Sequence, residues 1–382
     1  MAEYLNSLPL TELRKRKSTK WRSFPKDVLP LPVAEMDFPI AEPIKEALRD
    51  MIDRSDTGYL GPFPEMFEAF SDFSITKWGW KPDLTQMRIA TDVGVDTVEV
   101  IRTLIDPGDK VILNSPVYEN MWRWIAEVRA ELVDVPLLES EMKYAMDFEG
   151  LEKAYASGAK VHLLCSPHNP VGILFSKEDQ IRIAELAKKY GVIVISDEIH
   201  AGLTYLGNTF VPFLSVSDAA REVGICVTSA SKAFNLAGLK CAMIITENEA
   251  LKNRINTMPL SVAFRASLFG AVAATAAFNS AREWLDGALM TLNQNRNLIR
   301  TLIDTKIPAI NYRIPDFGYL AWLDLSNLGL GEDPTKTLLE QGKLAVNTGT
   351  VYGPTHKNFV RLNFGTSAEI IEEAFHRILR CL

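Results

Sequence analysis

Lys232 stands in a setting that suits carbonyl chemistry. It lies in the run Ser229-Ala-Ser-Lys-Ala-Phe-Asn-Leu-Ala-Gly-Leu-Lys240, directly after an apolar segment. Small residues beside a lysine suit a tight turn, in which backbone N–H groups and hydroxyls can hold an anion. A lysine amine attacks carbonyl groups once its pKa is lowered, and the charge of Lys240 is expected to lower it. An ordinary solvated loop lysine is the alternative.

Two further polar residues follow apolar segments in the same way. The run 192–195 leads into Ser-Asp197-Glu-Ile-His, and the run 161–165 leads into Ser-Pro-His-Asn169-Pro. A carboxylate such as Asp197 can pair with a protonated pyridine nitrogen, and an amide such as Asn169 can donate to a phenolic oxygen. Taken singly, Asp197 could equally cap a helix. Lys232, Asp197 and Asn169 can form one site only if the fold places their side chains close together.

Short apolar segments alternate with amphipathic helical segments from about residue 109 to 246, which is the pattern of parallel βαβ units. A helix is predicted over 177–190, where apolar residues recur at helical spacing. The strands are rich in Val, Ile and Leu, as strands covered on both faces require, and are predicted at 109–114, 160–165, 191–196, 223–228 and 241–246. Ligands bind at the carboxyl edge of such sheets. The sequence therefore predicts that the three polar residues share one crevice.

The chain changes character after about residue 280. A long helix is predicted at 282–303, strands at 319–324 and 358–363, and a final helix at 367–380. This order of elements predicts an α+β module, packed closely against the α/β part because no low-complexity linker separates them.

The bulk composition excludes several kinds of partner. The chain has 382 residues, with 41 Lys and Arg against 48 Asp and Glu, and its net charge of −7 is spread along its length. Nucleic acid requires a concentrated basic face, so no nucleic acid partner is predicted. The four cysteines form no C-x-x-C pair, and no metal site is predicted. No apolar run reaches the roughly 20 residues of a membrane helix, and no signal-peptide core is present, so we expect a cytoplasmic protein without membrane contact.

Together the three motifs resemble those of the aspartate-aminotransferase superfamily, fold-type I of the pyridoxal-phosphate enzymes, from about residue 27 to the end of the chain. The resemblance implies an α/β fold whose large domain, over 45–280, binds the cofactor and contains a mostly parallel seven-stranded sheet. It implies a smaller α+β domain formed by 1–44 and 281–382. The implied cofactor is pyridoxal 5′-phosphate, and the implied partner is a small amino-acid substrate.

The resemblance also implies a role for each matched residue. Lys232 and Asp197 are the implied catalytic residues, as the lysine that forms an imine with the cofactor and the carboxylate on its pyridine nitrogen. Asn169 matches the contact to the phenolic oxygen, and Tyr118 matches the aromatic that stacks on the ring. The other implied cofactor-binding residues lie in the phosphate loop, after the second motif and around the lysine: Val93, Gly94, Val95, His200, Ser229, Ser231 and Lys240.

Three more matches concern the substrate and a second subunit. Arg361, in Asn-Phe-Val-Arg-Leu-Asn-Phe, matches the arginine that grips the substrate α-carboxylate, and its planar fork suits that role. Ala34 matches a substrate-binding position. Tyr59 matches a tyrosine that reaches the cofactor phosphate of the neighbouring subunit, which implies a homodimer with shared active sites.

Several strings resemble the cystathionine β-lyase branch of this superfamily: Ser-Asp-Glu-Ile-His200, Leu31-Pro-Val-Ala-Glu-Met-Asp-Phe38, Phe234-Asn-Leu-Ala-Gly-Leu239 and Gly318-Tyr-Leu-Ala-Trp-Leu-Asp324. They favour β-elimination of cystathionine or related cysteine thioethers to pyruvate, ammonia and a thiol. An aminotransferase with a 2-oxo acid acceptor is the alternative, because the two reactions use the same residues. Pro32 and the run Glu119–Trp124 depart from the branch near the expected substrate mouth.

Two readings from other classes compete with this one. Ser229-x-x-Lys232 has the spacing of the acylating pair in penicillin-binding proteins, but no Lys-Thr-Gly follows and the partner-like Tyr118-Glu-Asn120 precedes the serine. A regulatory role through protein contact is also open, although the chain has no additional helix-turn-helix segment.

Overall fold

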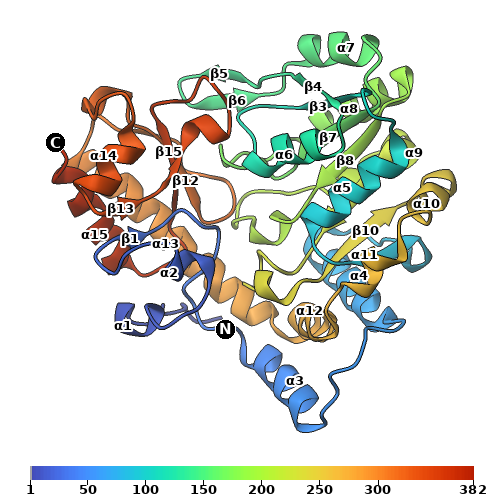
Figure 1. The fold of residues 1–382 in the computed structure, drawn as a ribbon, viewed down its shortest axis with the longest axis horizontal. Helices are drawn as coiled ribbons and strands as arrows, with labels where there is room; N and C mark the ends of the chain where they lie inside the picture. Colours follow the sequence, from blue (N-terminus) through green and yellow to red (C-terminus); the bar gives the residue numbers. More distant parts are fainter. Residues whose placement is uncertain (1) are drawn as a thin grey trace.

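The computed structural model describes residues 2–382, and its largest element is a seven-stranded sheet covered by helices on both faces (Figure 1). The strand order is β2-β10-β9-β8-β7-β3-β4, and only β10 runs opposite to the others. The strands are β2 Met87–Ala90, β3 Lys110–Leu113, β4 Glu131–Asp134, β7 Val161–Cys165, β8 Ile193–Asp197, β9 Gly224–Thr228 and β10 Ala242–Thr246. The predicted α/β fold with a mostly parallel seven-stranded sheet is confirmed.

The central strands are buried on both faces because their apolar side chains alternate between two cores. In β7, Leu163 and Leu164 point into different clusters, as expected for neighbours in a strand. The helices around this sheet are α3 Glu42–Asp53, α4 Pro64–Trp78, α5 Val93–Leu104, α6 Glu119–Glu127, α7 Phe148–Ala156, α8 Lys177–Tyr190, α9 Asp218–Val223, α10 Glu249–Ile255, α11 Leu260–Phe264 and α12 Leu268–Ser280. Such double coverage is what Val- and Ile-rich parallel strands require.

Helix α8 shows how local sequence fixes an element. Ser176 and Asp179 form a reciprocal capping box at its start, and Gly191 ends it with a φ of +69°. A left-handed residue at this position favours glycine because glycine has no Cβ. The predicted bounds of this helix, 177–190, are those observed.

The C-terminal part contains a four-stranded antiparallel sheet in the order β11-β12-β15-β14, packed beside the long helix α13. Figure 1 shows the N-terminal segment lying against this part, and β1 pairs with β13 in parallel. The remaining elements are α1 Leu10–Leu13, α2 Thr19–Arg22, β1 Leu29–Pro30, β5 Leu138–Ser140, β6 Lys143–Ala145, α13 Arg282–Lys306, β11 Asn311–Tyr312, β12 Leu320–Asp324, α14 Pro334–Glu340, β13 Leu344–Ala345, β14 Asn347–Thr348, β15 Phe359–Asn363 and α15 Ala368–Leu379. Within residues 2–382, no helix combines the length and apolarity needed to cross a membrane.

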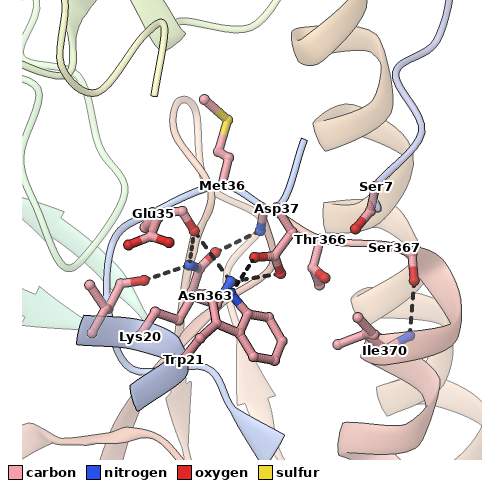
Figure 2. A network of polar contacts seen from close by, with 12 residues as sticks. Ser7, Lys20, Trp21, Glu35, Met36, Asp37, Asn363, Thr366, Ser367 and Ile370 are labelled. Carbon is pink, nitrogen blue, oxygen red and sulfur yellow. Dashed lines mark hydrogen bonds and ion pairs between the residues drawn. The ribbon is translucent and has the colours of Figure 1, made fainter. Parts of the chain in front are cut away.

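A network of polar contacts around the buried Lys20–Asp37 ion pair and Asn363 joins the N-terminal segment to β15 (Figure 2). Lys20 Nζ lies 2.7 Å from Asp37 Oδ2, and neither side chain is exposed. Trp21 donates its indole N–H to the other carboxylate oxygen of Asp37 at 3.1 Å. Asn363, on β15, donates to the carbonyl oxygens of Val33 and Glu35 at 2.6 and 2.7 Å. The Asn363 hydrogen bonds hold residues 33–35 against the C-terminal sheet, and the ion pair links Asp37 to Lys20 within the N-terminal segment.

Candidate active site

A cavity of about 800 Å³ opens at the carboxyl edge of the seven-stranded sheet. Register places Cys165, Asp197 and Val227 side by side at the ends of β7, β8 and β9, so the segments that follow these strands meet there. Thirteen of the fourteen predicted site residues line the cavity: Ala34, Val93, Gly94, Val95, Tyr118, Asn169, Asp197, His200, Ser229, Ser231, Lys232, Lys240 and Arg361. The fourteenth, Tyr59, lies outside it with 90% of its surface exposed.

Lys232 presents its amine within this cavity. Its Nζ donates to the backbone carbonyl of Ala34 at 3.1 Å, which holds the side chain in place. The protein around it removes water from the ammonium form, and Arg361 adds repulsion, so the pKa of Lys232 falls to about 8. The predicted cause was wrong: Lys240 does not lower this pKa, because its own charge is paired with Asp92.

Lys232 in the cofactor-free protein is therefore expected to react with an amine-directed reagent at lower pH than an ordinary lysine side chain. Only the neutral amine is nucleophilic, so its labelling should reach half of the maximum near pH 8, whereas a lysine side chain in a model peptide titrates at about 10.4. Mass spectrometry of the labelled protein across pH 6 to 11 measures the Lys232 profile, with a lysine model peptide in the same mixture as the comparison. A Lys232 profile that coincides with that of the model peptide would contradict the lowered pKa.

Asp197 is the last residue of β8 and is 5% exposed. Burial raises its pKa to about 6, although a backbone hydrogen bond from Ile199 and the charge of Lys232 both oppose the rise. Burying a carboxylate with so few partners is costly, and a cation or N–H donor brought beside it would offset that cost. A positively charged partner would therefore stabilise the ionised carboxylate of Asp197.

Arg361 comes from β15 in the C-terminal sheet, and its side chain is 3% exposed. Its Nη1 donates to Asn169 Oδ1 at 3.1 Å and its Nη2 donates to the Pro32 carbonyl at 3.2 Å, while its Nε is buried with no hydrogen-bond partner among residues 2–382. The face of Tyr352 lies 4.8 Å from the guanidinium. These contacts orient a cation whose donors are incompletely used, as a carboxylate-binding arginine requires.

Tyr118 and His200 are two further polar residues that line the cavity. Tyr118 precedes α6, and its hydroxyl accepts a hydrogen bond from Asn120 at 2.6 Å. His200 is buried beside the rings of Phe317 and Tyr319. Burial holds its pKa well below the usual range, so the imidazole is neutral, and its Nδ1 has no partner in the described chain.

The start of α5 forms one end of the cavity. Asp92 caps this helix by accepting from the Val95 N–H at 3.0 Å, and it also pairs with Lys240 Nζ at 2.9 Å. Ser229 donates to the Cys241 carbonyl at 2.6 Å and accepts from the Ser231 N–H. A helix start with a lysine beside it attracts anions. The carboxylate of Asp92, a residue that the sequence analysis did not single out, occupies these anion-binding groups in the structure. A bound phosphate would replace it there.

These groups fit a phosphorylated pyridine aldehyde. The amine of Lys232 suits the carbonyl group, and the incompletely partnered carboxylate of Asp197 suits a protonated ring nitrogen. Lys240 and the N–H groups at the start of α5 suit the phosphate. Arg361 also lines the cavity and has a free donor with which it could bind the carboxylate of a second molecule. The residues present therefore match both a pyridoxal phosphate cofactor and an amino acid beside it.

Comparisons with known proteins agree with this geometry over the whole chain. The sequence matches the family described as aminotransferase class I and II over residues 26–378. It is 38% identical to the putative cystathionine beta-lyase of Mycobacterium tuberculosis, covering 99% of this chain and 98% of that protein, and 32% identical to cystathionine beta-lyase PatB of Bacillus subtilis, covering 93% of each.

Solved structures give the same result. A putative PLP-dependent beta-cystathionase from Corynebacterium diphtheriae superposes with a TM-score of 0.93 at 29% identity, covering 98% of both chains. Cystalysin from Treponema denticola, whose structure contains pyridoxal 5′-phosphate, superposes with a TM-score of 0.92 at 25% identity, covering 100% of this chain and 98% of that one. The chain therefore belongs to the class I and II aminotransferase family.

Proposed function

We propose that this protein is a pyridoxal-phosphate-dependent carbon–sulfur β-lyase that converts cystathionine or related cysteine thioethers to pyruvate, ammonia and a thiol. The observation that carries the proposal is the meeting of Lys232, Asp197 and Arg361 in one cavity, in a chain whose full-length relatives include proteins named cystathionine beta-lyase. Its catalytic residues are Lys232 and Asp197.

The chain's own residues would hold the cofactor from several sides. Lys232 would bond its carbonyl carbon, Asp197 would pair with its ring nitrogen, Asn169 would donate to its phenolic oxygen, and Tyr118 would stack on the ring; all four line the cavity. The other residues that would contact the cofactor line the same cavity: Val93, Gly94, Val95, His200, Ser229, Ser231 and Lys240. When bound, the cofactor supplies a protonated ring that withdraws electrons from the substrate Cα.

Each catalytic step then assigns a task to a residue of this chain. Arg361 binds the substrate α-carboxylate and so fixes the position of Cα. Lys232, released when the substrate amine takes its place at the carbonyl carbon, would take the Cα proton as a neutral amine. Asp197 keeps the proton on the ring nitrogen. The C–S bond at Cβ then breaks, the thiolate departs with the electron pair, and hydrolysis of the remaining three-carbon fragment gives pyruvate and ammonia.

We further propose a homodimer with shared active sites in the cytoplasm. Tyr59 supports the dimer, because a side chain exposed over 90% of its surface and outside the cavity is available to a second copy. The partner subunit's Tyr59 would then reach the phosphate end. The domain division into 45–280 and 1–44 with 281–382 also stays a proposal, supported by the separate sheets of the two parts.

Product analysis with L-cystathionine tests the proposed reaction. Purified protein loaded with pyridoxal phosphate is expected to release pyruvate, ammonia and a thiol in equal amounts without any 2-oxo acid. The same mixture with added 2-oxoglutarate should form no glutamate. If pyruvate does not appear and glutamate forms only when 2-oxoglutarate is added, the protein is an aminotransferase and not a lyase.

A further inference from the structure

Glu119 places a second acid group beside the arginine of the proposed carboxylate site. It is the first residue of α6 and lines the same cavity as Lys232 and Arg361. Its Oε2 is buried, accepts no hydrogen bond of ordinary geometry among residues 2–382, and lies 3.8 Å from Arg361 Nη1, with the Tyr352 hydroxyl as its other polar neighbour. At that distance the two side chains attract each other without a hydrogen bond.

The charges at this end of the cavity do not balance once a substrate is bound. The single positive charge of Arg361 would then face two negative charges, those of the substrate α-carboxylate and of Glu119. One of these two carboxylates would lack a partner of opposite charge. Glu119 is also the first residue of α6, and a helix N-terminus attracts negative charge. An ionised group removed from water requires a partner of opposite charge.

The substrate itself can supply the missing cation. Its α-amino group is engaged at the cofactor on the Lys232 side, so it is not available to Glu119. Arg123, the nearest basic residue along α6, contacts the Asn120 side chain and does not line the cavity. A positive charge on the departing arm of the substrate would therefore meet the unpartnered carboxylate oxygen.

We propose that Glu119 is a specificity-determining residue that selects cysteine thioethers whose sulfur carries an arm ending in an ammonium group. The proposal rests on the β-lyase function proposed above and narrows its substrate class. Cystathionine meets this requirement in part, because its distal arm carries an ammonium group together with a carboxylate. Glu119 takes no part in breaking bonds: its carboxylate lowers the energy of cationic arms in the cavity and raises that of anionic arms.

Three thioethers of similar size separate the effect of charge from that of shape. S-aminoethyl-, S-propyl- and S-carboxymethyl-L-cysteine carry a cationic, a neutral and an anionic arm. We expect kcat/KM for pyruvate release to fall in that order in the native enzyme. In Glu119→Gln the cationic substrate should lose roughly tenfold or more, while the neutral one changes little, and the anionic one should improve. Glu119→Asp, which keeps the charge, should retain the native order.

A matched control and a second measurement keep the outcomes distinct. Glu131→Gln removes the same charge from an exposed position outside the cavity and should leave all three values unchanged. Titration of the bound cofactor's absorbance with the same compounds reads their affinities without turnover. An order of affinities equal in the native enzyme and Glu119→Gln would overturn the role of Glu119. A charge-dependent order of affinities without pyruvate release would instead overturn the lyase function and leave the selectivity standing.

Discussion

Lys232→Ala is expected to abolish turnover, with a loss in kcat of roughly 10³-fold or more. Under the proposed function, the alanine variant lacks both the amine that bonds the cofactor and the base that takes the Cα proton. Among residues 2–382, the other lysine that lines the cavity is Lys240, which is paired with Asp92. Pyruvate release from cystathionine measures the loss. The variant should also fail to hold the cofactor through a covalent bond.

Lys177→Ala serves as the control for this prediction, because Lys177 is an exposed residue at the start of α8. It should keep native activity and native cofactor content. Circular dichroism of both variants checks that each is folded. Activity of Lys232→Ala within tenfold of the native value would show that another residue supplies the base.

Asp197→Asn is expected to lower kcat by roughly 10²- to 10⁴-fold while raising the stability of the cofactor-free protein. The amide keeps the shape of the side chain but cannot hold a proton on the ring nitrogen by charge. Pyruvate release measures the loss of activity, and cofactor content should remain near the native level because Lys232 is intact. Near-native turnover would mean that Asp197 does not contact the ring nitrogen.

The stability effect follows from the raised pKa of Asp197, about 6 when folded against 3.8 as an ordinary value. A group that binds its proton more tightly when folded stabilises the fold at low pH, and this stabilisation is lost as the pH rises through about 6. At pH 8 the charged carboxylate should therefore cost the cofactor-free protein up to about 3 kcal/mol relative to a neutral amide. Thermal unfolding of the two cofactor-free proteins at pH 8 and pH 4 should show a large difference that nearly vanishes in acid.

The meeting of Asn169, Asp197 and Lys232 was predictable because parallel strands share a direction. Each residue lies at or just after the end of an apolar run, and neighbouring parallel strands bring their carboxyl ends to one edge. The alternation of strands and helices between them was enough to infer parallel pairing. Arg361 has no such signal in its own segment, so its placement in the site came only from the resemblance to a family.

Two other contacts of the site could not be predicted from the sequence. Ala34 meets Lys232 through a backbone carbonyl across 198 positions, and any residue type carries that group. Asp92 and Lys240 pair across 148 positions, and neither flank marks the pairing. The Ala34 contact depends on how residues 33–37 are held by Asn363 and by the buried Lys20–Asp37 pair (Figure 2), which only the folded chain shows.

Within the seven-stranded sheet, two strands and one strand direction were not predicted from the sequence. β2 and β4 have four residues each, and β4 exposes Glu131 and Leu132, so neither shows the long apolar run of a central strand. The antiparallel direction of β10 has no counterpart in its composition, which is as apolar as that of its parallel neighbours. Strand β8 begins two residues later than predicted and ends on Asp197, which places that carboxylate inside the sheet.

The measurement that tests the central claim most directly is the position of the cofactor on the chain. Borohydride reduction of the protein loaded with pyridoxal phosphate fixes the cofactor on whichever lysine bonds it, and peptide mass spectrometry then locates the label. We predict one label per chain, on the peptide that contains Lys232. A label on any other lysine, or none on the Lys232 peptide in a fully loaded protein, would contradict the assignment of the cavity as the cofactor site.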